Sequence, residues 1–167
     1  MVMTQARNRT YSTHNNIPAD QRQVIIDILN QALAETLDLK TQAKQAHWNV
    51  KGLNFIALHE MFDTFATTLE GYVDMVAERV TALGGTAMGT ARIAASASTL
   101  PEYDLTAVNG QQHLEALLAR YGQYASSIRA NIDKTAELGD ADTADLFTEI
   151  SRQIDSDMWF IEAHLQG

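Results

Sequence analysis

Apolar residues recur at spacings of three and four along four long stretches of the chain, and this spacing marks one face of an α-helix. The first stretch begins at Ile17-Pro18 and ends near Asn49, before Gly52. The second begins at Leu53 or Asn54 and ends at Gly84-Gly85. At 1.5 Å per residue, a helix of roughly 30 residues spans about 45 Å. Helices of this length are typical of bundles.

The second half of the chain repeats this pattern after a long connection. Residues 86–104 are rich in Ala, Ser, Thr and Gly, and the segment is too long for a simple turn. We expect it to cross the bundle and to contain a short helix around 91–97. A third helix is predicted from residue 105 or 108 to Leu138. A fourth is predicted to begin within 140–143, with Asp140 or Asp142 as its N-cap, and to end near Leu165.

Two long helices, a crossover and two further helices predict an all-α fold, the ferritin-like four-helix bundle with one long connection between its second and third helices. The positions expected to face the core include Val24, Ile25, Leu29, Leu33, Phe55, Phe62, Leu69, Val76, Tyr121, Tyr124, Ile128, Phe147, Ile154 and Trp159.

Length and composition narrow the class of protein. The 167 residues suit one domain, which we place at 17–167 after a polar, flexible tail at 1–16. The absence of cysteine excludes disulfides, zinc fingers and thiol catalysis. We find neither an apolar run long enough to cross a membrane nor a secretory signal, so we expect a cytoplasmic protein.

The charge is unevenly distributed along the chain. The whole chain carries a net charge of −9, but the first 19 residues carry +2, from Arg7 and Arg9, so the remainder carries −11. An acidic body repels nucleic acid and attracts cations. We therefore expect only weak, salt-sensitive DNA binding, through the tail.

Four potential metal ligands lie on one arc of the second predicted helix. At about 100° per residue, with His59 at zero, Asp63 lies near 40°, Asp74 near 60° and Glu78 near 100°. The His59/Asp63 pair and the Asp74/Glu78 pair are separated by eleven residues, or about 16 Å. One metal ion cannot bridge that distance, since ligand bonds are about 2 Å long. The pairs therefore predict two half-sites.

A second copy of the chain would join these half-sites. If a two-fold axis passes near Thr68-Leu69, each pair faces the complementary pair of the partner, giving two equivalent sites. His47 could add a second imidazole. Such donors suit Fe(II), Mn²⁺ and Zn²⁺, and iron fits carboxylates best. The alternative interpretation is a solvated polar face without a metal.

Two other patterns have competing interpretations. The run His59-Glu60-Met61-Phe62-Asp63 approaches the zinc-peptidase pattern, with Glu60 as general base, but we find no convincing third ligand. Acidic residues also gather at the start of the last helix, where they can line a cation pore or simply cap the helix. They are Asp142, Asp145 and Glu149.

Two longer motifs carry a family resemblance. The run from His47 to Gly52, followed by Leu58-His59 and Asp63, resembles the first signature of the Dps family, the DNA-binding proteins from starved cells. The run Val73 to Arg79, followed by Leu83-Gly84-Gly85, resembles the second. The similarity extends from about Ile17 to Leu165.

This resemblance implies a hollow homododecamer with ferroxidase sites at its two-fold interfaces. By the resemblance, His47, His59 and Asp63 come from one subunit, and Asp74 and Glu78 come from its neighbour. Fe(II) is then oxidised, preferably by hydrogen peroxide, and stored as ferric mineral, which protects DNA from oxidative damage.

The resemblance also suggests roles for residues outside the ligand set. It implies that Asp145, with its acidic neighbours, lines a three-fold iron pore. We consider Trp48 as an electron donor to the site, although packing in an interface explains it equally well. Lys44, one turn before His47, could form a salt bridge near the site, but we favour a solvated lysine.

Two other classes of function compete with the ferroxidase. One is a nucleoid-associated protein whose main role is to compact DNA, and the weakly charged tail argues against it. The other is an inert bundle whose polar face is only solvated.

Overall fold

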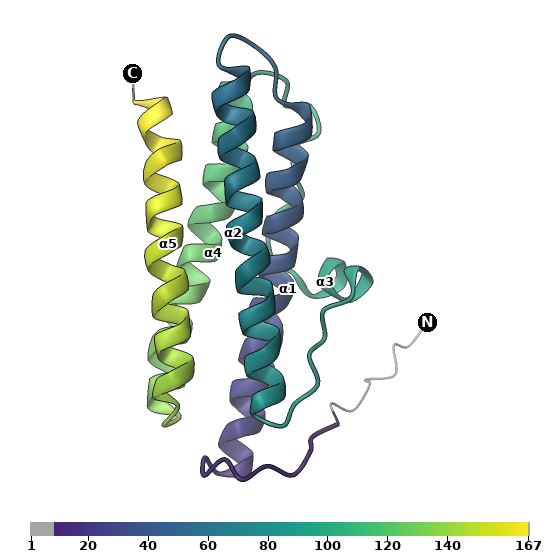
Figure 1. The fold of residues 1–167 in the computed structure, drawn as a ribbon, viewed down its shortest axis with the longest axis vertical. Helices are drawn as coiled ribbons and strands as arrows, with labels where there is room; N and C mark the ends of the chain where they lie inside the picture. Colours follow the sequence, from purple (N-terminus) through teal and green to yellow (C-terminus); the bar gives the residue numbers. More distant parts are fainter. Residues whose placement is uncertain (1–8, 167) are drawn as a thin grey trace.

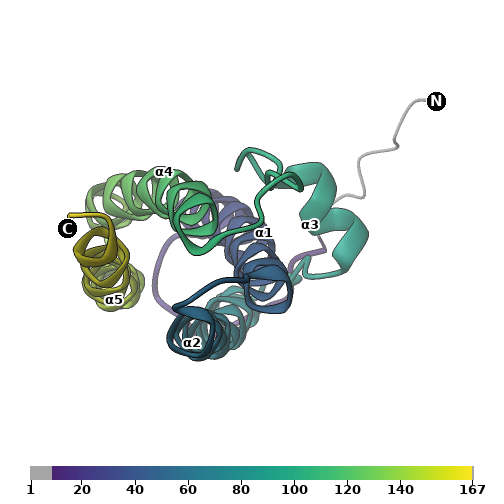
Figure 2. The ribbon, with the colours of Figure 1, turned by 90° about the horizontal axis from the view of Figure 1, so that it is seen from above.

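Five helices make up the computed structural model, which describes residues 9–166. They are α1 (Ala19–Asn49), α2 (Phe55–Ala82), the short α3 (Ala91–Ala97), α4 (Gly110–Glu137) and α5 (Ala141–Leu165). The four long helices lie side by side, and α3 stands outside them against α1 (Figures 1 and 2). The all-α, ferritin-like bundle predicted from the sequence is therefore confirmed, including the short helix in the crossover.

The predicted ends of the helices hold to within a few residues, and the largest difference is at α4. This helix begins at Gly110 because Asn109 forms a capping box. The Asn109 side chain accepts from the Gln112 backbone N–H at 3.0 Å, and the Gln112 side chain accepts from the Asn109 N–H at 3.1 Å. Two otherwise unpaired backbone donors are thereby satisfied, so the helix cannot begin at 105 or 108.

The cap of α5 decides between the two predicted candidates. Asp140 is 2% exposed and is the N-cap, since its carboxylate accepts from the Thr143 backbone N–H at 3.0 Å. Asp142 is exposed on the first turn and is not the cap.

Three of the residues predicted to lie in the core are exposed. Val24 is 47% exposed, Phe55 42% and Trp159 62%. In α1 the side chain next to Val24, that of Ile25, is fully buried instead. It points about 100° further round the helix than Val24 does. The other predicted positions, among them Tyr121 and Tyr124 of α4, are buried and belong to one continuous core.

The N-terminal segment contacts the body from Arg9 onward. The Tyr11 backbone N–H donates to the Gly84 carbonyl at 2.7 Å, and the Thr86 hydroxyl donates to the Arg9 carbonyl at 2.9 Å. The predicted flexible tail covers 1–16, of which 1–8, including Arg7, lie outside the described residues. The domain division at residue 17 stays a prediction.

Gly84 offers a test of this contact. It ends α2 with φ 85°, and an added Cβ would lie 2.7 Å from the Tyr11 carbonyl oxygen. We expect Gly84→Ala to lower the free energy of unfolding by about 1–2 kcal/mol or more, because a left-handed backbone is strained for residues with a Cβ. Gly122→Ala is the control, since Gly122 lies inside α4 with no atom within 4 Å of an added Cβ. Urea unfolding in which both variants are equally stable would contradict this account.

Candidate metal centre

His47 and His59 form a tightly arranged pair where α1 ends and α2 begins. Their rings stack with centroids 3.7 Å apart and an interplanar angle of 21°. His47 Nδ1 lies 2.7 Å from the His59 carbonyl oxygen, and His59 Nδ1 lies 2.8 Å from the His47 carbonyl oxygen. A carbonyl can only accept, so each Nδ1 carries its proton. In a neutral imidazole this leaves the Nε2 lone pair for a metal ion, the arrangement usual in histidine ligation.

A tight connection brings these two histidines together. Gly52 adopts φ 118°, which is a left-handed backbone conformation that favours glycine. The Phe55 N–H then donates to the Gly52 carbonyl at 3.1 Å as α2 begins. The ring of Phe55 lies 5.0 Å from that of His59. The partly exposed Phe55, which we predicted to be in the core, therefore borders the histidine pair.

Asp63 lies one turn after His59 and is paired with Lys44. The Lys44 Nζ is 2.5 Å from Asp63 Oδ1. This hydrogen bond is the main cause that lowers the pKa of Asp63, and the two histidines contribute less. Lys44 therefore forms a salt bridge near the site, which is the alternative we weighed, and the solvated lysine that we favoured is wrong. The Asp63 side chain is still 49% exposed, so its other oxygen remains accessible to a cation.

Trp48 follows His47 in the chain, and its side chain points away from the core into solvent. It is 66% exposed, and the Lys44 ammonium lies 5.8 Å from the centroid of its ring. One lysine thus contacts both Asp63 and the indole. A large, exposed aromatic surface therefore follows His47 directly in the chain and lies against Lys44.

Asp74 and Glu78 are exposed on the distal half of α2. Asp74 is fifteen residues beyond His59, or about 22 Å along a straight helix. Within the described part of one chain, no three His, Asp or Glu side chains are arranged to hold a metal ion. The histidine pair and the distal carboxylates thus lie far apart on one exposed side of α2.

Arg79 is a structural residue of this region that we did not single out from the sequence. Its Nη2 lies 2.7 Å from Asp140 Oδ1, and its Nε donates to the Thr143 hydroxyl at 2.9 Å. The pairing holds the end of α2, just after Glu78, against the start of α5. A basic residue in the last turn of a helix was the available signal, because it favours contacts with acidic caps.

The acidic residues predicted to line a pore lie on the exposed side of α5. Asp142 Oδ2 is 3.8 Å from Arg79 Nη2, with 86% of its side chain exposed. Asp145 and Glu149 are also exposed. A pore needs several subunits, so their role there stays a prediction.

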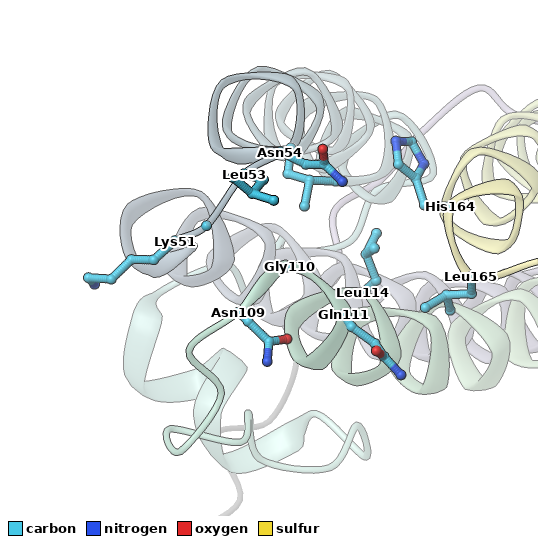
Figure 3. Close-up of a pocket in the computed structure, with 11 residues that line it drawn as sticks. Lys51, Leu53, Asn54, Asn109, Gly110, Gln111, Leu114, His164 and Leu165 are labelled. Atoms are coloured by element: carbon cyan, nitrogen blue, oxygen red, sulfur yellow. The ribbon is translucent and has the colours of Figure 1, made fainter. Parts of the chain in front are cut away.

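A cavity of about 400 Å³ lies at the end of the bundle near residues 51–54 (Figure 3). Polar side chains from several elements border it, namely Lys51, Asn54, Asn109, Gln111 and His164. None of the predicted metal ligands borders this cavity.

Among the described residues, no helix is long and apolar enough to cross a membrane.

The fold agrees with comparisons to known proteins. Residues 26–167 match the ferritin-like domain, so the chain is a ferritin-like protein. A DNA protection during starvation protein of Agrobacterium fabrum is 46% identical over 158 residues, which are 95% of this chain and 98% of the relative.

Solved structures narrow the class further. DpsA14 from Streptomyces coelicolor has a TM-score of 0.90 and 32% identity, covering 95% of this chain and 94% of that one. A Mycobacterium smegmatis Dps has a TM-score of 0.89 and 33% identity, covering 93% and 94%. The chain belongs to the Dps family, as its two motifs suggested.

Proposed function

We propose that this protein is a ferroxidase and an iron-storage protein. Fe(II) is its substrate, hydrogen peroxide is the preferred oxidant, and the sites lie between two copies of the chain. The ferric product is stored in a hollow homododecamer, and DNA is protected because both reagents are consumed. The ferritin-like fold and the Dps relatives support this proposal.

The observation that carries the proposal is the histidine pair. Each Nδ1 is held by a backbone carbonyl, so both rings are fixed with Nε2 available. Asp63, kept ionised by Lys44, adds a carboxylate oxygen nearby. Asp74 and Glu78 of a second copy complete the set with two further carboxylates. Two imidazoles and three carboxylates suit iron, and Zn²⁺ or Mn²⁺ can occupy the same donors.

The chemistry follows from the charges of these ligands. Carboxylates favour the ferric product over Fe(II), because they carry negative charge. Peroxide accepts two electrons, so each molecule oxidises two Fe(II) ions: two Fe(II), one peroxide and two waters give two FeOOH and four protons. When both electrons come from iron, no hydroxyl radical is released.

The stoichiometry provides a direct test. Fe(II) is loaded under anaerobic conditions, and peroxide is added in steps while the absorbance of ferric product is followed. We expect the reaction to end at one peroxide for every two Fe(II), with little hydroxylation of a radical trap. An end point of one peroxide per Fe(II), with abundant trapped hydroxyl radical, would show that the polar face does not act on iron.

The geometry also predicts where the two copies meet. Gly71 lies near 120° on the same wheel, about 20° beyond Glu78, and close to the expected two-fold axis. It is exposed, and no other segment of the chain lies within 4 Å of an added Cβ. A residue so placed lets a partner helix approach closely. A glycine inside an exposed helix otherwise costs about 1 kcal/mol relative to alanine.

We therefore expect Gly71→Arg to dissociate the assembly and abolish Fe(II) oxidation while the helical content is retained. Native mass spectrometry and circular dichroism measure the two effects. Gly122→Arg, on α4, is the matched control and should leave the α2 interface intact. Full assembly and activity in Gly71→Arg would place the two-fold contact elsewhere.

The remaining sequence-based predictions concern the assembled particle. We propose that Asp145 and Glu149, with Asp142, guide Fe(II) through a three-fold pore. Binding to DNA is proposed to be weak and carried by Arg7 and Arg9, of which Arg9 is exposed and Arg7 lies outside the described residues. A cytoplasmic location near the nucleoid would fit both roles.

A further inference from the structure

A second cavity, of about 410 Å³, lies between α1 and the crossover, on the side of α1 where α3 stands (Figures 1 and 2). The residues of α1 that line it fall within an arc of about 120° on the helical wheel. They are Asp38, Thr41, Gln42, Gln45 and Trp48. From the first to the last of them the helix rises by about 15 Å. The cavity is therefore an elongated groove, which we call the crossover groove.

Hydrogen bonds fix the two walls of the crossover groove relative to each other. The Ser98 hydroxyl donates to Asp38 Oδ2 at 2.6 Å, and Gln42 Nε2 donates to the Pro101 carbonyl at 3.0 Å. The crossover thus runs beside α1 in the same direction along the helix. Because these bonds join separate elements, the shape of the groove is part of the fold and exists before any ligand binds.

The charged groups that line the crossover groove are acidic. Asp38 and Glu102 contribute carboxylates, and among the residues that the structure describes no lysine or arginine lines the groove. The Glu102 side chain is exposed and forms no ion pair within the described part of the chain. The acidic body of the protein adds to the attraction for cations. The groove therefore favours a positively charged ligand.

Gln42 adds an acceptor that lacks a donor. The residue is 5% exposed, and its Nε2 donates to both Asp38 Oδ1 and the Pro101 carbonyl at 3.0 Å, which fixes the orientation of the amide. Its Oε1 is buried without a hydrogen-bond partner among the described residues. A buried acceptor without a donor is costly. A ligand that carries N–H groups can remove this cost.

The end of the crossover groove near the start of α4 is aromatic and apolar. Trp48 and Leu105 line it and are 66% and 77% exposed, and Tyr103 lies between them and the carboxylates. The Trp48 ring already has one ammonium near it, that of Lys44 at 5.8 Å from its centroid. Lys44 is paired with Asp63, which offsets its charge. Aromatic rings attract ammonium groups, and apolar walls suit methylene chains.

We propose that the crossover groove binds a linear polyamine, with its ammonium groups paired to Asp38 and Glu102 and a methylene segment against Trp48. A single divalent metal ion fits less well, because it needs several oxygen ligands in one shell. No three His, Asp or Glu side chains are so arranged in the described part of the chain. This binding function is separate from iron oxidation and does not depend on it.

The fluorescence of Trp48 reports such binding directly. The chain has two tryptophans, and a Trp159→Phe background leaves Trp48 as the only indole. Spermidine is titrated into the assembled, metal-free protein at low ionic strength, because salt screens exposed charges. We expect a saturable change in the Trp48 emission. Hexamethylenediamine should have the same effect, whereas hexanediol, which has the same carbon chain without the charges, should have none.

Substitutions in the same background locate the site. Glu102→Gln should raise the Kd about tenfold, since a hydrogen bond to a charged group is lost. Asp38→Asn should act in the same direction, but it also alters the contact with Ser98, so Glu102→Gln is the decisive variant. Glu115→Gln is the matched control, because Glu115 is exposed on α4 and does not line the groove. It removes the same charge and should leave the Kd within about twofold.

Three results would overturn the proposal. The first is an equal response to hexamethylenediamine and hexanediol, and the second is a Kd that does not change in Glu102→Gln. The third concerns a second copy of the chain, which is the competing occupant of the groove. In that case the assembled protein does not bind spermidine, whereas the dissociated Gly71→Arg variant does. Native mass spectrometry establishes the state of assembly in each titration.

Discussion

The initial rate of Fe(II) oxidation falls at least about 100-fold when His59 and Asp63 are both replaced by alanine. Loss of residues that only orient metal ligands already costs about 10–100-fold, and these two residues would bind the metal directly. His59→Ala also removes the ring that stacks on His47. The measurement is the absorbance of ferric product after peroxide is added to anaerobic, Fe(II)-loaded protein.

Glu60→Ala is the matched control for this double variant. Glu60 is an exposed carboxylate on the same helix, next to His59, and is not assigned to the metal centre. Its removal should leave the rate within about twofold, because substitutions of exposed residues usually change free energies by about 0.5 kcal/mol or less. The same variant tests the peptidase interpretation, in which Glu60 would be the general base. A large loss in Glu60→Ala together with a small loss in the double variant would mean that the ligands are wrongly assigned.

Asp157→Asn is expected to stabilise the protein at neutral pH. Asp157 is 2% exposed, its Oδ2 has no hydrogen-bond partner among the described residues, and Gln153 donates to Oδ1 at 2.8 Å. Burial raises its pKa from 3.8 to about 6, and the Gln153 hydrogen bond only partly opposes this. An ionised carboxylate is therefore held in the core at pH 7, where an uncharged amide would be less costly.

The sign of the pH dependence follows from the direction of this shift. The folded state binds the proton more tightly than the unfolded state, so the contribution of Asp157 is most favourable below about pH 4. It is lost as the pH rises to about 6 and stays constant above. With 1.36 kcal/mol per unit, Asp157→Asn should add up to about 3 kcal/mol at pH 7 and almost nothing at pH 4.

Thermal unfolding between pH 4 and 7 measures this difference. Asp155→Asn is the control, because Asp155 is an exposed partner of Arg129 at 2.8 Å, and exposed ion pairs contribute about 0–1 kcal/mol. A stability gain in Asp157→Asn that does not vary with pH would contradict the assignment of a buried, titrating carboxyl group.

The sequence predicted the helices well because local rules determine them. Helical spacing of apolar residues locates α1, α2, α4 and α5, and glycines such as Gly84 and Gly139 follow helix ends with φ 85° and 80°. The start of α4 was misplaced because the capping box at Asn109 competes with the apolar residues before it. Exposure of Trp159 could not be predicted, because helical spacing alone does not show which apolar residues form the edge of a stripe.

The candidate site was predictable in composition but not in geometry. The arc on α2 identified His59, Asp63, Asp74 and Glu78. The two bonds from Nδ1 to carbonyls were not predictable, because they depend on how the turn at Gly52 places α1 against α2. The same holds for the pair Lys44–Asp63, which joins α1 to α2.

Mixing two inactive variants tests most directly whether the site is shared between subunits. One variant carries His59→Ala and Asp63→Ala, and the other carries Asp74→Ala and Glu78→Ala. Each alone should be inactive, because every two-fold site then lacks half of its ligands. In a mixed two-fold pair, one site loses both halves and the other regains both.

Co-assembled from equal amounts, the two variants should recover roughly a quarter of the unmodified rate, since half of the random pairs are mixed and each restores one of two sites. Native mass spectrometry confirms that mixed assemblies form. A mixture that contains mixed pairs but stays inactive would contradict a site built from two chains.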